Sequence, residues 1–216
     1  MGARAIARAR RGAVHAAPTR LERDAMTTVH LFAKYPTPGK VKTRLIPALG
    51  AGGAAALHRR LTERTVAAMR AADLPFAVRY SGADEAAFAE WLGADVRLIE
   101  QGDGDLGARM GRVEAPAVLL GADVPDLSAD HIRAMAAALE RAPVAIGPAE
   151  DGGYWSIAFA RALPLLWDAM DWGTDRVLPE TLRRLEAAGI EPALLETLAD
   201  CDRPEDLERW PWLKPA

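Results

Sequence analysis

The chain has 216 residues, is 50% hydrophobic and carries a formal net charge of −3. That length suits one sizeable domain or two small ones. The slightly negative charge argues against general nucleic-acid binding, because nucleic-acid binders present basic surfaces.

The sequence also bears on compartment and on zinc. Cys201 is the single cysteine, so an intramolecular disulfide is excluded and a reducing cytoplasm suits the chain. The histidines are scattered and show no zinc-ligand spacing. No apolar run approaches the ~20 residues that a membrane span needs. We therefore expect a cytoplasmic protein with no membrane span.

Residues 1–25 differ in composition from the rest, being rich in Arg, Ala and Gly. No apolar stretch follows Arg10 and Arg11, which excludes a secretory signal. The composition favours a disordered basic leader over residues 1–26, or a mis-started N-terminus with Met26 as the natural first residue. We expect one folded domain over residues 27–216.

From Thr28 onward, strand and helix patterns alternate. Strands are expected over 29–34, 75–81, 95–100, 115–123, 143–150, 154–160 and 191–196. Helices are expected over about 51–72, 84–93, 129–142 and 174–188, with a terminal helix from Pro204. Asp84, Ser128 and Thr174 are the expected N-caps. This alternation predicts a three-layer α/β/α fold around a mostly parallel sheet.

Ligands of open α/β sheets bind beyond the carboxyl ends of the strands, so the loops there deserve inspection. The first loop, KYPTPGKVKTRL, crowds Lys40, Lys42 and Arg44 around a turn at Gly39. It lacks the P-loop pattern. A bound phosphate would relieve the repulsion among these cations, and Lys and Arg are common phosphate ligands. The alternative is a solvated basic loop.

The second loop, LLGADVPDLS, places Asp123 at the end of the most apolar strand. A carboxylate there costs desolvation unless it is paired or bound to a metal. Mg²⁺ takes one or two protein carboxylates together with substrate phosphates, a role that suits Asp123. Capping of the turn is the alternative.

Two further loops carry acidic residues. In AEDGGYW, Asp151 and Tyr154 would flank a ligand, and Gly152 and Gly153 would permit close backbone approach, although an ordinary β-turn fits equally well. In LADCDRPEDL, Asp200 and Asp202 alternate and so face one side of an extended segment. Asp202 would be a second metal ligand if this segment approaches Asp123. Taken alone, capping of the helix at Pro204 is the stronger interpretation.

The segment IEQGDGDLGARM contains G-x-G-x-x-G at Gly102, Gly104 and Gly107, and Asp123 follows by the ~20 residues that a dinucleotide fingerprint requires. Two observations argue against an NAD site. Asp103 and Asp105 would oppose a pyrophosphate, and the motif follows an internal strand rather than the first strand of a nucleotide-binding half.

Five segments, FAKYPTPGKVKTRL, QGDGDLGARM, LLGADVPDL, AEDGGYW and DCDRPEDL, occur here in one order. Together they resemble a GT-A-fold transferase family labelled rSAM/selenodomain-associated transferase 1, or arsenosugar-biosynthesis glycosyltransferase. The resemblance covers nearly all of residues 28–210. More distant similarity is to molybdenum-cofactor and 2-phospholactate guanylyltransferases and to CMP-sugar synthetases.

The resemblance implies a nucleotide-diphospho-sugar transferase (GT-A) fold, Mg²⁺ or Mn²⁺ as cofactor, and a nucleotide plus a small-molecule acceptor as partners. The resemblance implies that Asp123 and Asp202 are metal ligands and that Lys42 and Arg44 are the basic residues of the site. With the loops above, we predict Asp123, Asp202 and Asp200 as the metal residues and Lys42, Arg44 and Asp151 as the catalytic ones. The predicted nucleotide-binding residues are Gly39, Lys40, Thr43, Gln101, Asp105, Arg109, Gly152, Gly153 and Tyr154. Asp105 would also cap the helix that follows it.

One position departs from the family pattern, because Arg203 stands where the family has Thr before Pro204. A helix cap is thereby lost, and a cation lies beside an implied metal ligand.

Two reactions stay open from the sequence. In nucleotidyl transfer, Lys42 and Arg44 would hold an NTP while a phosphorylated or sugar-like acceptor attacks and pyrophosphate leaves. In glycosyl transfer from a nucleotide-diphospho-sugar, Asp151 would be the base that the acceptor hydroxyl needs. A non-catalytic nucleotide-binding domain is the third, weaker alternative.

Overall fold

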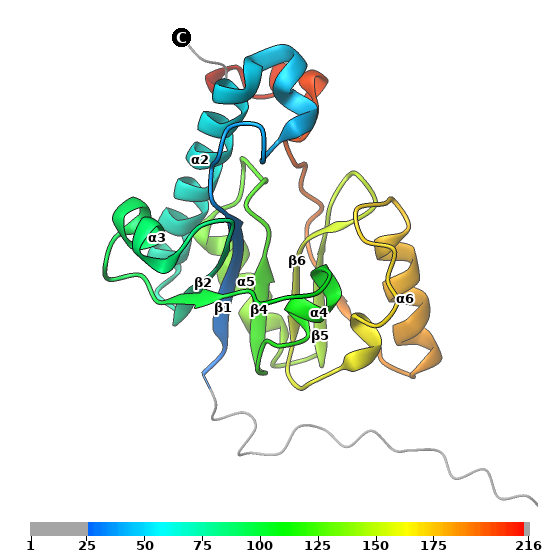
Figure 1. The fold of residues 1–216 in the computed structure, drawn as a ribbon. Helices are drawn as coiled ribbons and strands as arrows, with labels where there is room; N and C mark the ends of the chain where they lie inside the picture. Colours follow the sequence, from blue (N-terminus) through cyan, green and yellow to red (C-terminus); the bar gives the residue numbers. More distant parts are fainter. Residues whose placement is uncertain (1–25, 214–216) are drawn as a thin grey trace, which may run out of the picture.

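The computed structural model describes residues 26–213, and its centre is a seven-stranded sheet in the order β3-β2-β1-β4-β6-β5-β7 (Figure 1). The strands are β1 (Thr28–Lys34), β2 (Phe76–Ser81), β3 (Leu98–Glu100), β4 (Ala117–Leu120), β5 (Val144–Pro148), β6 (Tyr154–Phe159) and β7 (Ala193–Leu194). Only β6 runs antiparallel to its neighbours, β4 and β5, within these residues. The predicted mostly parallel sheet is confirmed. The predicted leader over residues 1–26 lies outside the described residues except for Met26.

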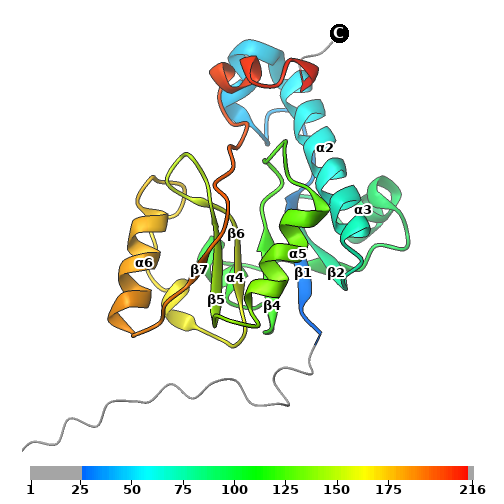
Figure 2. The ribbon, with the colours of Figure 1, turned by 180° about the vertical axis from the view of Figure 1, so that it is seen from behind.

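Helices cover both faces of the sheet, as the alternating pattern predicts (Figures 1 and 2). The helices α2 (Ile46–Ala72), α3 (Glu85–Leu92) and α5 (Ala129–Ala138) supply the first hydrophobic cluster with its helical residues. The short α4 (Leu106–Met110) and α6 (Val177–Ala187) supply the second cluster, on the opposite face. Neighbouring strand residues alternate between the two clusters: Leu31 belongs to the first and Phe32 packs on the second.

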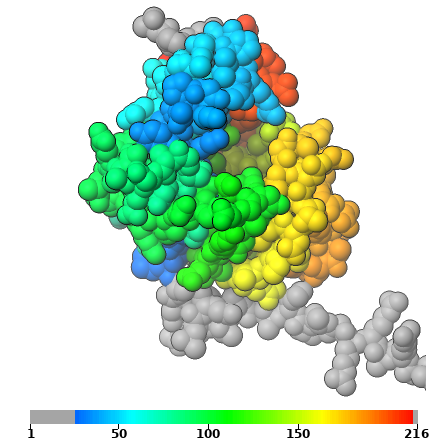
Figure 3. Space-filling view, viewed as in Figure 1, coloured from blue at the N-terminus to red at the C-terminus, as the bar shows by residue number. Residues whose placement is uncertain are grey.

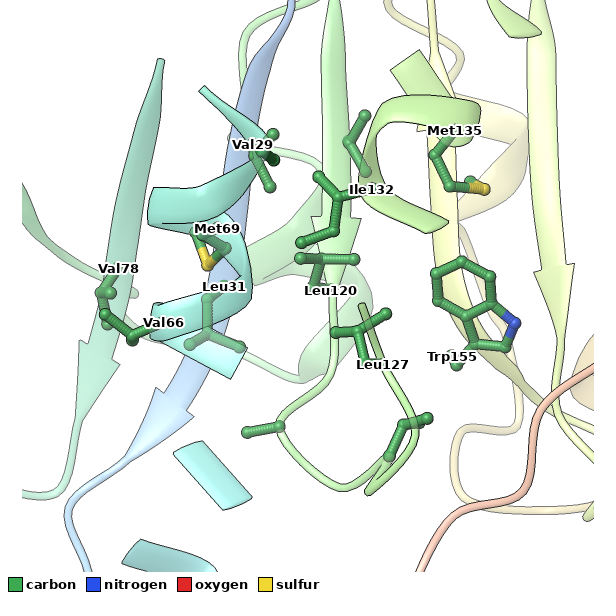
Figure 4. Packing of buried hydrophobic residues seen from close by; sticks show 14 of the residues in the cluster. Val29, Leu31, Val66, Met69, Val78, Leu120, Leu127, Ile132, Met135 and Trp155 are labelled. Atoms are coloured by element: carbon green, nitrogen blue, oxygen red, sulfur yellow. The ribbon is translucent and has the colours of Figure 1, made fainter. Parts of the chain in front are cut away.

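The first cluster is the larger one and fixes α2 and α5 against the sheet. Figure 4 shows Val66 and Met69 of α2 beside Leu31 of β1, and Ile132 of α5 over Leu120 of β4. Leu31, Ile132 and Met135 are completely buried. The buried hydrophobic clusters on the two faces hold the strand ends in place, and the loops that follow these strands are held with them.

Two of the three predicted helix N-caps are confirmed, and the third is wrong. The carboxylate of Asp84 accepts from the N–H of Ala87, and the hydroxyl of Ser128 accepts from the N–H of His131. The expected cap at Thr174 is wrong, because α6 begins only at Val177 with Arg176 as a cap that makes no side-chain bond. The N–H of Leu178 donates to the carbonyl of Gly152, so the start of α6 is fixed by packing on the Asp151 loop.

Three element boundaries also differ from expectation. Helix α2 begins at Ile46 rather than at the expected residue 51, with a kink at Gly50 where φ is 68°. The last strand shrinks to the two residues of β7, and the terminal helix is a pair of 3₁₀ helices, Pro204–Glu208 and Pro211–Leu213. Leu207 and Trp210 of this segment pack on Leu57 and Leu61 of α2 in a third cluster. The C-terminal segment is therefore clamped beside the first half of α2, as Figure 2 shows.

No helix within residues 26–213 has both the length and the apolar character that crossing a membrane requires.

Candidate functional site

The predicted loops meet at the carboxyl edge of the parallel strands. The N–H of Cys201 donates to the carbonyl of Asp123 at 2.9 Å, which ties the 199–202 segment to the end of β4. The segment that carries Asp202 therefore approaches Asp123, as a shared metal site would require. The sequence pattern alone could not predict that these two chain segments lie side by side.

A cavity of about 490 Å³ lies between these loops, and we call it the acidic cleft. Figure 3 shows a hollow on this face, bordered by the blue N-terminal part of the chain and by the yellow segment. The carboxylates that line the cleft are Glu150, Asp151, Asp175, Asp200, Asp202 and Asp206. Its arginines are Arg44, Arg203 and Arg209. A polyanionic ligand therefore needs accompanying positive charge to bind here.

Lys42 joins the two carboxylates predicted as metal ligands. Its Nζ lies 3.2 Å from Asp202 Oδ1 and 3.8 Å from Asp123 Oδ2. The Lys42 side chain is only 6% exposed, and its backbone adopts a left-handed conformation with φ of 44°. Arg44 Nη1 donates to the other oxygen of Asp202 at 2.6 Å. Lys42 and Arg44 therefore form one ion-pair network with Asp123 and Asp202.

The network shifts the pKa values of two carboxyl groups in opposite directions. Burial raises the pKa of Asp202, but attraction and hydrogen bonds from Lys42 and Arg44 outweigh it and leave that pKa below its usual range. Burial, together with repulsion from Asp123 and Asp151, raises the pKa of Asp200 to about 6. Asp202 is thus held ionised, whereas Asp200 is poised to take up a proton near neutral pH.

The residues of the network fit a hard divalent cation. Asp123 and Asp202 offer carboxylate oxygens, the ligand type that Mg²⁺ and Mn²⁺ prefer, and they already attract one positive charge, the Lys42 ammonium. Within residues 26–213, no group of three or more His, Cys, Asp or Glu side chains is arranged to hold a metal ion. The predicted trio of Asp123, Asp200 and Asp202 is therefore not assembled as a three-ligand centre. Two carboxylates plus substrate phosphates remain sufficient for Mg²⁺.

The Asp151 loop is a tight connection between β5 and β6, as both interpretations of its sequence allowed. Asp151 Oδ1 accepts from the N–H of Gly153 at 2.9 Å, which orients the carboxylate at the rim of the cleft. Gly152 has φ of 88°, and a Cβ there would lie 2.5 Å from the carbonyl oxygen of Asp175. Glycine is thus required for packing against the segment before α6. Tyr154 is partly buried beside this loop, and burial of its hydroxyl raises the pKa of that group.

The glycine motif serves the backbone. Gly102 and Gly104 have φ of 73° and 96°, conformations that side chains disfavour. A Cβ on Gly107 would lie 2.5 Å from the Trp167 carbonyl oxygen and 2.8 Å from Trp172 Nε1. The motif therefore lets the chain turn and seats α4 directly on two tryptophans.

Gln101, Arg109 and Asp105 each have protein partners. Gln101 is buried, and its Nε2 donates to the carbonyls of Ala33 and Arg79 while its Oε1 accepts from Arg109. Asp105 Oδ1 accepts from the N–H of Ala108, which confirms it as the helix cap. The contacts of Gln101 and Arg109 brace the ends of β1 and β2 against α4; their contact with a nucleotide stays a prediction.

The rest of the basic loop is open. Gly39 and Lys40 are exposed, and Thr43 is exposed at the start of a 3₁₀ helix, Thr43–Leu45. A Cβ on Gly39 would meet nothing within 4 Å, although its φ of 77° favours glycine. These residues remain accessible to a ligand.

Two supporting residues escaped the sequence analysis. His58 on α2 has its Nε2 2.8 Å from the carbonyl oxygen of Lys34, and burial lowers its pKa. A lone histidine on an apolar helix face gives no signal for such a contact. Asp206 Oδ2 accepts from the N–H groups of Asp202 and Arg203, which fixes the backbone at the start of the 3₁₀ helix Pro204–Glu208.

The model of a family described as an uncharacterized protein conserved in bacteria, DUF2064, matches residues 64–174, about half of the chain. The chain belongs to the DUF2064 family. The matched region of this DUF2064 protein includes Asp123 and Asp151 and excludes the basic loop and Asp202. A search of curated proteins gave no match.

Solved structures place the fold among nucleotide-dependent transferases. A Desulfovibrio desulfuricans G20 protein with the provisional name nucleotide-diphospho-sugar transferase is 31% identical, with 82% of each chain covered and a TM-score of 0.76. A nucleotidyl transferase from Methanothermobacter is 22% identical, with 85% and 95% covered and a TM-score of 0.55. Rv0371c from Mycobacterium tuberculosis H37Rv, solved with manganese, is 17% identical, with 86% and 97% covered and a TM-score of 0.50. The last two similarities are similarities of fold.

Proposed function

We propose that residues 27–216 form a metal-dependent transferase domain that uses a nucleotide-activated substrate, with transfer of a nucleotidyl group from an NTP as the primary reaction. The observation that carries this proposal is the contact of Lys42 with both Asp123 and Asp202 at the carboxyl edge of the sheet. This network combines cations for phosphate with carboxylates for a metal ion.

Within this proposal, each side chain has a defined role. Lys42 and Arg44 leave Asp202 in part and bind the donor's phosphates, and the open turn at Gly39, Lys40 and Thr43 supplies further contacts. Asp123 and Asp202 hold Mg²⁺ or Mn²⁺, which when bound neutralises phosphate charge. Such chemistry depends on positioning and charge more than on a protein base.

The second candidate is glycosyl transfer from a nucleotide-diphospho-sugar. It is favoured by the 31% identity to the Desulfovibrio protein with that provisional name and by the oriented carboxylate of Asp151 at the rim of the cleft. An inverting reaction would use that carboxylate as the base for an acceptor hydroxyl. The resemblance to the family labelled rSAM/selenodomain-associated transferase 1 supports the same reaction, because that family is also labelled as a glycosyltransferase family.

A donor screen separates the two reactions. The full chain is incubated with Mg²⁺, a pool of small acceptors, and either labelled NTPs or labelled nucleotide sugars. Nucleotidyl transfer releases pyrophosphate, whereas glycosyl transfer releases a nucleoside diphosphate. Release of neither product from any donor would leave the third alternative, a non-catalytic nucleotide-binding domain.

A further inference from the structure

A second cavity, of about 260 Å³, adjoins the acidic cleft, and we call it the apolar slot. Its aromatic and apolar walls include Phe32, Met110, Leu119, Tyr154 and Trp172, which all belong to or pack on the second hydrophobic cluster. Asp151, Gly173 and Thr174 line both cavities, so the slot and the cleft meet at these residues. A molecule in the slot would therefore lie next to a donor in the cleft.

The walls of the slot are preformed. The Trp172 ring stacks on Trp167 and meets Tyr154 edge-on, with 6.4 Å between centroids in each pair. The α4 backbone at Gly107 rests on Trp172, since a Cβ there would lie 2.8 Å from Trp172 Nε1. Little ordering is needed before a ligand binds, which favours affinity.

The charge of the slot selects among ligands. Asp123 and Asp151 are its charged lining residues, and no Lys, Arg or His from residues 26–213 lines it. Lys42 contacts Asp123 but does not line the slot. With Asp123 engaged by a cation, a phosphate ester would exchange water for the Asp151 carboxylate and apolar walls, whereas an uncharged molecule with an apolar face would release water from aromatic walls.

We propose that the apolar slot binds the acceptor, and that this acceptor is an uncharged hydroxyl compound with an apolar face rather than a phosphate ester. The inference rests on the proposed function and narrows its acceptor class. With an NTP donor, the acceptor oxygen forms a bond to the α-phosphorus and its proton passes to the Asp151 carboxylate. The bond from the α-phosphorus to pyrophosphate breaks, and its electron pair leaves with pyrophosphate.

The tryptophans allow a direct test by NMR of their indole N–H signals on the full chain. The Trp172 ring lines the slot, Trp210 lines the cleft, and Trp91 lies outside both cavities. Matched probes are glycerol and glycerol 3-phosphate, glucose and glucose 6-phosphate, and benzyl alcohol and benzyl phosphate. We expect the alcohol of at least one pair to bind about tenfold more tightly than its phosphate, as read from the Trp172 signal, a factor that corresponds to ~1.4 kcal/mol.

A charge-insertion variant with a matched control sharpens the test. Leu106 lines the slot and is 42% exposed, so Leu106→Lys adds a cation there without burying it. Leu194 on β7 is 57% exposed and does not line the slot, so Leu194→Lys makes the same change elsewhere. We expect Leu106→Lys to shift the preference toward the phosphate member by at least about fivefold, since a single nearby charge contributes ~1 kcal/mol or more. Leu194→Lys should keep the wild-type preference.

Each contrary result overturns the inference. Equal or tighter binding of the phosphates by the wild type does so, and so does the absence of any alcohol-induced shift at Trp172. A parallel titration with Mg²⁺ and nucleotides, read at Trp210, tests the proposed function separately. A nucleotide response at Trp210 without an alcohol response in the slot would refute the acceptor class alone.

Discussion

Lys42 is the residue on which the site depends. Its ammonium is nearly buried and contacts a carboxylate that is 160 positions away in the sequence. The sequence predicted Lys42, Arg44 and Asp123 as functional from their positions at strand ends, and Asp202 through the family resemblance. It could not predict that the cations and the carboxylates pair with one another, because that pairing depends on how the C-terminal segment folds back onto β4.

Replacement of Lys42 should separate its effect on metal affinity from its effect on transfer activity. In Lys42→Met, loss of an ammonium 3.2 Å and 3.8 Å from the carboxylates removes a charge that repels a metal ion. We expect the affinity for Mn²⁺ alone to rise about tenfold, as ~1 to 4 kcal/mol of Coulomb energy at ~4 Å allows, while transfer activity falls.

The affinity is measured by calorimetric titration without nucleotide. Arg141→Met, at an exposed position beyond α5, is the control and should leave Mn²⁺ affinity unchanged. Unchanged or weaker Mn²⁺ binding by Lys42→Met would show that the acid pair is not a cation site.

Among the elements, α4 shows most clearly how a sequence motif can mislead. The G-x-G-x-x-G spacing is that of a dinucleotide fingerprint, yet Gly102 and Gly104 provide turns and Gly107 provides contact with Trp167 and Trp172. The sequence argues against NAD on charge grounds, and its prediction of the Asp105 cap is confirmed. It could not predict the tryptophan contacts, because Trp167 and Trp172 lie in a loop far along the chain.

A pair of glycine substitutions tests this packing. A Cβ at Gly107 would collide with Trp167 and Trp172, whereas a Cβ at Gly52 in α2 would meet nothing within 4 Å. We expect Gly107→Ala to lower the free energy of unfolding by about 1–3 kcal/mol through overpacking. Gly52→Ala should raise it by up to about 1 kcal/mol through helix propensity.

Urea unfolding of the two variants and the wild type gives both free energies. If both variants move the same way, α4 is not seated as described.

At the scale of the whole molecule, the fold was the most predictable feature. Alternating strand and helix patterns gave the layers and the mostly parallel sheet, because each element's apolar period reflects the face it buries. Short terminal elements were less predictable: β7 and the 3₁₀ helices are held by packing on β5 and α2 rather than by their own pattern.

Global stability should depend on pH through His30 in β1. Burial, then the charges of Arg79 and Arg97, lower its pKa from 6.5 to about 4, so the folded chain keeps it neutral. The unfolded chain takes up a proton below pH 6.5. Stability is therefore full above 6.5 and falls as the pH drops from 6.5 toward 4.

Urea unfolding at pH 7 and pH 5 should show a loss of about 2 kcal/mol from this group. His30→Gln, which keeps an acceptor for Arg79, should lose less over the same interval. An equal loss in both proteins would assign the pH dependence to other groups.

We propose that this DUF2064 protein uses Asp123 and a divalent cation to act on a nucleotide-activated donor. The most direct measurement is product release from the donor found in the screen, with Mg²⁺ or with a chelator, for wild type, Asp123→Asn and Asp130→Asn. Asp130, 88% exposed on α5, is the matched control. The account predicts that chelation and Asp123→Asn each lower turnover by more than about 100-fold, beyond the usual effect of merely supporting a metal ligand, and that Asp130→Asn keeps wild-type turnover. Full turnover by Asp123→Asn, or in the presence of chelator, would contradict it.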